Sequence, residues 1–209
     1  MRKLYTIANY LAIITIGYNM IEGVVSVWLG AADETLSLFG FGVDSFVEVI
    51  SGIGIWHMVG RIQANGVETK DNFEQQALRI TGWAFYILTF ALVFSAGVSL
   101  YEQHNPSSTF WGIIVSLVSI SFMWLLIHYK TKVGKALNSS AILADAACSR
   151  VCLYLSLVLL IASAGYELTG SRIFDPAGAL LIAFFSYREG KEAFQKSRGL
   201  SCCCNEDCE

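Results

Sequence analysis

The sequence predicts an all-α membrane protein, a bundle of six transmembrane helices with both termini in the cytoplasm. The 209 residues are 55% hydrophobic and only 15% charged, and the mean hydropathy is +0.54, which is too apolar for an ordinary soluble domain. Long uncharged runs recur along the chain, and most cations lie between alternate runs. With a net charge of −3 there is no basic surface, so we expect membrane lipid and no nucleic acid as a partner.

Each predicted helix is an apolar run of about 20 residues, the length that crosses the hydrocarbon core of a bilayer. The runs lack the alternating pattern of barrel strands, so helices are expected. The first run has no small-residue cleavage site and holds Asn19 and Glu22 in its later half, so we interpret it as a helix and not as a signal peptide. The expected spans are Leu4–Leu29, Leu36–Val59, Ala77–Leu100, Phe110–Tyr129, Ser140–Tyr166 and a shorter one at Ile173–Tyr187.

We expect two parts, a six-helix transmembrane domain at residues 1–196 and a cysteine-rich cytoplasmic tail at residues 197–209. About twenty residues follow the sixth run, too few for a cytosolic domain, so any homodimer would form through the transmembrane helices. The thiols of the tail favour soft-metal capture over S-palmitoylation, although their adjacent spacing matches no rigid zinc motif. These thiols belong to Cys202, Cys203, Cys204 and Cys208.

The distribution of Lys and Arg predicts the orientation, because cytoplasmic loops carry an excess of both. Of the 14 cations, all but Arg150 and Arg172 lie at the N-terminus or after the second, fourth and sixth runs. Arg172 alone occupies the connections on the opposite side, and Arg150 lies within the fifth run. Both termini are therefore expected on the cytoplasmic side, which requires an even number of spans.

Two pairs of candidate ligands lie within the expected spans. Asp44 and Glu48 are four residues apart in the second run, so both carboxylates lie on one face of a helix. Cys148 and Cys152 repeat this spacing in the fifth run, and Asp145 precedes Cys148 by three residues. Four oxygen and sulfur donors between two helices suit tetrahedral Zn²⁺. The thiols alone would more often be packing residues, but paired carboxylates at membrane depth favour a cation or protons between them.

The run NMIEGVVSVWLG followed by LSLFGFGVDSFVEVISG resembles the first two helices of the cation diffusion facilitator family of metal-ion/proton antiporters. In that family two acidic residues separated by three others supply half of the metal site, and Asp44 and Glu48 match them. LNSSAILADAACSRVC is similar to the fifth helix, where His and Asp usually occupy the positions of Cys148 and Cys152. DPAGALLIAFFSYREGKEAF resembles the sixth helix of short members that consist of the transmembrane domain.

The resemblance implies a secondary transporter and not an enzyme, with metal cations and protons as its partners and no resident cofactor. Cysteines in place of His and Asp soften the site, so we expect Zn²⁺, Cd²⁺ or another thiophilic cation. Arg150 is expected to offset part of the negative charge, and Asp145 to be a ligand or to support one. Alternatives are a metal-binding or sensing subunit that does not transport and, less favoured because no C-x-x-C pair occurs, a membrane thiol-redox protein.

A labelling experiment tests the orientation. In a cysteine-free background, a single Cys placed at 105–108 should react with an impermeant maleimide added outside cells, because the connection there carries no Lys or Arg. A single Cys at Lys132 should react only after the membrane is opened. The reverse pattern would overturn the orientation and with it the direction of any proton coupling.

Overall fold

The computed structural model describes residues 2–65, 72–102, 108–137 and 140–198, and it confirms the six predicted helices. Each helix is longer than its apolar run because polar residues continue it at one or both ends. The helices are α1 (Arg2–Ala32), α2 (Leu36–Asn65), α3 (Asn72–Glu102), α4 (Phe110–Leu137), α5 (Ser140–Thr169) and α6 (Phe174–Ser197).

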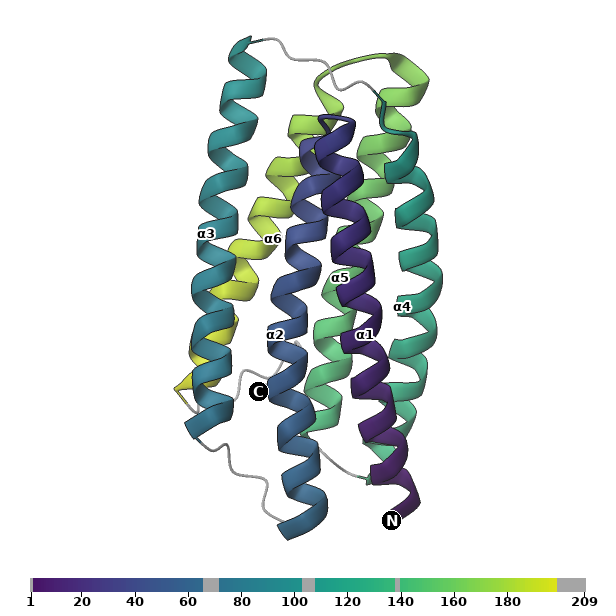
Figure 1. Cartoon of the computed structure of the whole chain (residues 1–209), viewed down its shortest axis with the longest axis vertical. Coiled ribbons are helices and arrows are strands. Elements are labelled where there is room, and N and C mark those ends of the chain that lie inside the picture. The colour runs from purple at the N-terminus through teal and green to yellow at the C-terminus, as the bar shows by residue number, and fades with distance from the viewer. Residues whose placement is uncertain (1, 66–71, 103–107, 138–139, 199–209) are drawn as a thin grey trace, which may run out of the picture.

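The helices alternate in direction, so α1 begins and α6 ends towards the same end of the bundle (Figure 1). The most extensive packing joins α1 to α2, α3 to α6 and α4 to α5. Helix α2 also contacts α3, α5 and α6, which places it at the centre of the bundle. A polar side chain that points inward from α2 can therefore meet any of four other helices.

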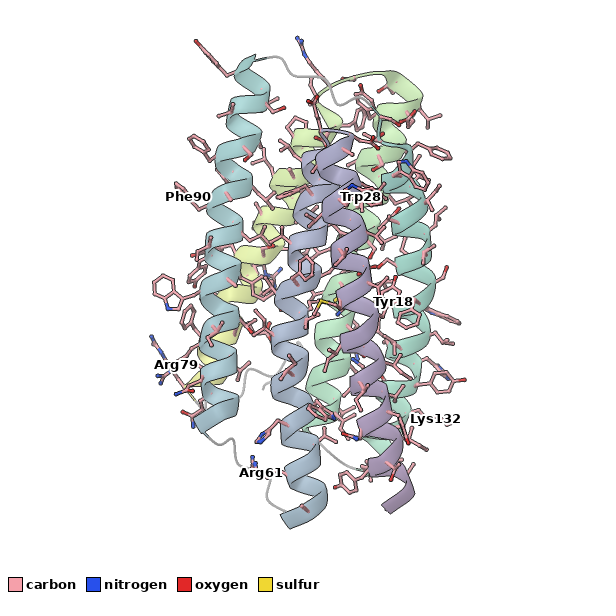
Figure 2. The ribbon with its side chains drawn as sticks, viewed as in Figure 1. Tyr18, Trp28, Arg61, Arg79, Phe90 and Lys132 are labelled. Atoms are coloured by element: carbon pink, nitrogen blue, oxygen red, sulfur yellow. The ribbon has the colours of Figure 1, made fainter. Side chains whose placement is uncertain are left out.

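Among the described residues, five helices are long and apolar enough to cross a membrane, and α6 is not one of them because charges fill its second half. Large apolar side chains cover the outside of the bundle, and Trp28 and Phe90 are both more than 70% exposed (Figure 2). Such an exposed apolar surface requires lipid around it. Arg61, Arg79 and Lys132 lie towards the end where α1 begins (Figure 2). The chain is a multi-pass membrane protein.

Helices α1 and α2 approach closely where Gly42 faces α1. A Cβ atom at this position would lie 2.7 Å from the backbone nitrogen of Val27 and 2.8 Å from Cβ of Ser26. Real Cβ atoms do not approach backbone this closely, so only glycine permits this contact. The contact brings the polar side chains of the neighbouring helical turns of α1 and α2 within hydrogen-bonding distance.

The first turn of α2 is capped by a side chain from α6. The carboxylate of Asp175 accepts hydrogen bonds from the backbone N–H of Leu36 at 2.9 Å, from the backbone N–H of Ser37 at 3.0 Å and from the Ser37 hydroxyl. Asp175 is only 2% exposed. Because the N-terminal N–H groups of a helix have no partner within it, this carboxylate both satisfies them and matches the helix dipole. The cap fixes α6 against the start of α2.

Replacing Asp175 with Ala should lower the free energy of unfolding by about 2–3 kcal/mol, because it leaves buried N–H donors without an acceptor. Thermal unfolding of the purified protein in detergent measures the loss. Asp33→Ala is the matched control, since one carboxylate oxygen of Asp33 is buried without a hydrogen-bond partner among the described residues, and it should change stability by less than about 0.5 kcal/mol. Equal losses in the two variants would show that the cap contributes nothing.

Candidate metal site

Helix α2 carries both predicted carboxylates into the interior, one helical turn apart. Asp44 is 3% exposed and Glu48 is partly buried. Ser45, also 3% exposed, points inward next to Asp44. Spacings of three and four residues keep these side chains on the inward face of α2, as the sequence predicts.

The carboxylate of Glu48 connects α2 to α5 and α1 through hydrogen bonds. Its Oε1 accepts a short hydrogen bond from the Sγ of Cys152 on α5, and its Oε2 accepts a hydrogen bond of 2.9 Å from Nδ2 of Asn19 on α1. Cys152 is 4% exposed and packs against Met123 and Leu126 of α4. The structure thus brings together one carboxylate and one thiol that the sequence predicts as ligands. It also adds Asn19, an amide that the sequence analysis did not include in the site.

Asp44 points to a different neighbour. The hydroxyl of Ser186 on α6 lies 3.5 Å from its Oδ1, a long hydrogen bond between two buried side chains. The carboxylates of Asp44 and Glu48 are therefore on one helix face but bonded to different helices. Within the described part of the chain, no three His, Cys, Asp or Glu side chains are grouped closely enough to hold a metal ion.

The remaining predicted ligands lie outside what the structure describes. The backbone of α5 includes Asp145 and Cys148, but their side chains are not among the described residues. The cysteines of the tail, at 202–204 and 208, also lie outside the described residues. Of the two predicted pairs, the structure therefore tests the positions of Asp44, Glu48 and Cys152.

The expected counter-charge comes from a different residue. Arg150 is exposed, because it lies two residues from Cys152 and such a spacing points to the other side of a helix. Lys130, which the sequence analysis placed in a loop, is instead 1% exposed inside α4. Its Nζ donates a hydrogen bond of 2.9 Å to the hydroxyl of Ser149, and its ammonium attracts the Glu48 carboxylate electrostatically. Arg150 is therefore not among the buried side chains around Glu48, and in the part of the chain that the structure describes Lys130 is the buried cation near Glu48.

Two apolar clusters lie on either side of the inward-facing polar side chains Asn19, Asp44, Glu48, Lys130 and Cys152, here called the polar layer. The first, here the α6-side cluster, lies on the side of the layer where α2 begins, and the second, the N-terminal cluster, lies towards the other end of α2. The α6-side cluster contains Leu38, Phe41, Leu88, Leu92, Leu155, Leu159, Ala179, Ile182 and Ala183, and the N-terminal cluster contains Ala8, Val59, Val133 and Ile142.

Comparison with known protein families identifies the family of the chain. The family described as "Cation efflux transmembrane domain" matches residues 9–198 of the 209-residue chain. The matched region includes α1 from residue 9 onward and all of α2 to α6, and it therefore contains Asn19, Asp44, Glu48, Lys130 and Cys152. No curated protein matches the sequence.

Proposed function

Because the chain belongs to the cation diffusion facilitator family, a family of metal-cation transporters, we propose that it exports a divalent thiophilic cation in exchange for protons. Zn²⁺ and Cd²⁺ are the proposed substrates. The proposed ligands are Asp44 and Glu48 on α2 with Cys148 and Cys152 on α5, supported by Asp145. Metal reaches this site from the cytoplasm, where both termini lie, after capture by the thiols of the tail, and copies of the chain pair through their membrane helices.

The observation that carries this proposal is the contact between Glu48 and Cys152. These residues are 104 positions apart in the sequence, on two different helices, yet carboxylate and thiol meet inside the bundle. A carboxylate and a thiol in contact can both bind a metal ion once they have lost their protons. The ligand spacing of four places Cys148 one turn of α5 away from the same contact.

The donor types support a thiophilic substrate. Thiolate ligands favour Zn²⁺, Cd²⁺ and Cu⁺ over Mn²⁺ and Mg²⁺, which prefer oxygen. Two carboxylates and two thiolates around one divalent ion leave an excess of negative charge, and such an excess is costly away from water. The buried ammonium of Lys130 reduces this excess, which supports a site that alternates between metal-bound and protonated states.

Proton exchange follows from the ligand chemistry. Thiols and carboxylates bind metal only after losing their protons, so metal affinity falls as the pH falls. When the metal leaves, protons neutralise the same groups. If the site opens alternately to the two sides of the membrane, an inward proton gradient drives metal outward. Apolar clusters lie on both sides of the polar layer, as expected for a site that opens to one side of the membrane at a time.

The variants Asp44→Ala and Glu48→Ala test this proposal. Each should reduce Zn²⁺ flux into proteoliposomes to the level of protein-free vesicles, because a divalent ion at membrane depth needs anionic ligands. An enclosed pH dye should record proton movement opposite to the metal for the unmodified protein and not for these two variants. Asp44→Asn and Glu48→Gln, which keep the shape of each side chain, guard against loss through misfolding.

Glu167→Gln is the matched control, since Glu167 lies at the end of α5 and its carboxylate accepts a hydrogen bond from the backbone N–H of Thr109 at 2.8 Å. It should transport normally. Normal flux in the Asp44 and Glu48 variants would remove both residues from the site. Metal binding without flux in the unmodified protein would favour the alternative of a metal-sensing subunit.

Substituting the thiols tests the softness of the site. Cys148→Ser combined with Cys152→Ser should weaken Cd²⁺ binding by about a hundredfold or more, because a hydroxyl is a poor ligand for soft ions. Cys148→His combined with Cys152→Asp should shift the preference from Cd²⁺ towards Zn²⁺. Competition between the two metals, measured by equilibrium dialysis, gives both results.

The control for the thiols replaces the four tail cysteines with Ser in the full chain. This change should cost less affinity, because the tail concentrates metal near the site but does not form it. If the tail replacement removes Cd²⁺ binding while the changes at Cys148 and Cys152 do not, the thiols of α5 are packing residues and the site is assigned wrongly.

A further inference from the structure

A third carboxylate lies inside the bundle beside the proposed site. Glu22 of α1 is 7% exposed. Its Oε1 accepts a hydrogen bond of 2.8 Å from the Tyr18 hydroxyl, its Oε2 accepts one of 3.1 Å from the Ser45 hydroxyl, and Ser119 of α4 also hydrogen-bonds to it. These described partners are all neutral hydroxyls. A carboxylate placed at membrane depth among neutral groups is costly, and such residues usually mark an ion pathway.

Two buried oxygen atoms on the same face of α1 have no hydrogen-bond partner among the residues that the structure describes. Oδ1 of Asn19, a residue 1% exposed, has none, although the Nδ2 of the same amide donates to Glu48. Oγ of Ser26, which is fully buried, also has none. Asn19 and Ser26 lie three and four residues from Glu22, so they flank it on one face of the helix. Buried polar atoms are rarely left unpaired, and an absent ion is one of the recognised reasons.

We propose that Glu22, Asn19 Oδ1 and the hydroxyls of Ser45 and Ser119 form a second cation position, built of oxygen ligands alone. A hydroxyl that donates to a carboxylate in the empty site can rotate and offer a lone pair to a cation. Carboxylate, amide carbonyl and hydroxyl oxygens together are the donors that divalent cations such as Mn²⁺ bind and that Zn²⁺ and Cd²⁺ accept. The ligand is a divalent cation, held less selectively than at the thiols.

The second position communicates with the first through shared side chains. The amide of Asn19 bonds Glu48 through nitrogen, which places its free oxygen beside the same carboxylate. The hydroxyl of Ser119 lies 2.8 Å from that of Ser156, one turn of α5 beyond Cys152. Ring stacking between Tyr18 and Phe122, with centroids 3.8 Å apart, fixes α1 against α4 here, and Figure 2 shows Tyr18 on the α4 side of α1.

The inference rests on the proposed function, because it gives the exported cation a second binding position along its path. Glu22 and Ser45 lie nearer to the α1–α2 connection than Asn19 and Glu48 do along their helices. A cation that leaves Glu48 and Cys152 towards that connection therefore meets Glu22 next. Two positions of different softness allow transfer in steps, since a weaker oxygen site releases an ion that a thiolate site would retain.

Cadmium NMR of the full chain in lipid nanodiscs tests the second position. Replacement of the four tail cysteines with Ser leaves the thiols of α5 as the only sulfur in this background besides the methionines. Sulfur ligation shifts the cadmium resonance far from that of oxygen-bound cadmium, so the two positions give separate signals. We expect both signals in this background, loss of the oxygen-bound signal alone in Glu22→Gln, and both signals in the control Glu167→Gln.

The outcomes separate this inference from the proposed function. A sulfur-bound signal without an oxygen-bound one, or an oxygen-bound signal that survives Glu22→Gln, overturns the second position and leaves the first intact. An oxygen-bound signal that depends on Glu22, without any sulfur-bound signal, supports the second position and overturns the assignment of Cys152. No bound cadmium of either kind overturns both.

Transport kinetics distinguish a cation ligand from a structural residue. Glu22→Gln keeps the shape and most hydrogen bonds of the side chain, yet it should lower the maximal rate of Zn²⁺ flux by roughly tenfold or more, because it removes a charged ligand. The half-saturating concentration should stay within about twofold of normal, since the first site is unchanged. Glu22→Asp should recover part of the rate. Equal loss of rate and affinity, or no loss, would make Glu22 a structural residue.

Discussion

The cost of placing charge inside a lipid-surrounded bundle determines how this structure is built. Water cannot solvate a carboxylate there, so each one needs hydrogen bonds from other helices or a cation. Asp175 is satisfied by the backbone of α2, and Glu22 by hydroxyls of three helices. Among the described residues, Glu48 accepts hydrogen bonds from a thiol and an amide, and Asp44 from a hydroxyl at 3.5 Å. Neutral donors do not balance the charge of a buried carboxylate, so a bound cation would stabilise Glu22, Asp44 and Glu48 alike.

Helix α2 connects these carboxylates to the rest of the bundle. Its start is capped by α6, its middle contacts α1 and α5 through Glu48, and its close approach to α1 depends on Gly42. The same helix contributes Leu38 and Phe41 to one apolar cluster and Val59 to the other. Helix α2 thus contributes residues to the polar layer and to both apolar clusters. A shift of α2 therefore changes the packing of the polar layer and of both clusters at once.

Hydropathy and spacing predicted the six helices and the inward direction of Asp44, Glu48 and Cys152, because a long apolar run and a four-residue spacing each constrain one helix by itself. They failed where the answer depends on how helices rotate against one another. Lys130 directly follows the fourth apolar run, where a loop residue was expected. Helix α4 instead continues to Leu137, and the side chain of Lys130 is buried in the bundle. Arg150 lies within a run but two residues from Cys152, a spacing that should have indicated its exposed position. The partnership of Asn19 with Glu48 has no sequence signal, because nothing local relates the register of α1 to that of α2.

The hydrogen bonds of the two α2 carboxylates link cation binding to helix packing. Asp44 bonds Ser186 of α6, whereas Glu48 bonds Asn19 of α1 and Cys152 of α5. A cation that binds both carboxylates must draw them to one point and so must replace at least one of these bonds. Loss of the Asp44 bond weakens the attachment of α2 to α6, which itself packs extensively on α3. Loss of a Glu48 bond weakens the attachment of α2 to α1 or α5. A ligand shifts a conformational equilibrium only through such differences in contact between its bound and empty states, and here those contacts run between α6 and the helices around Glu48.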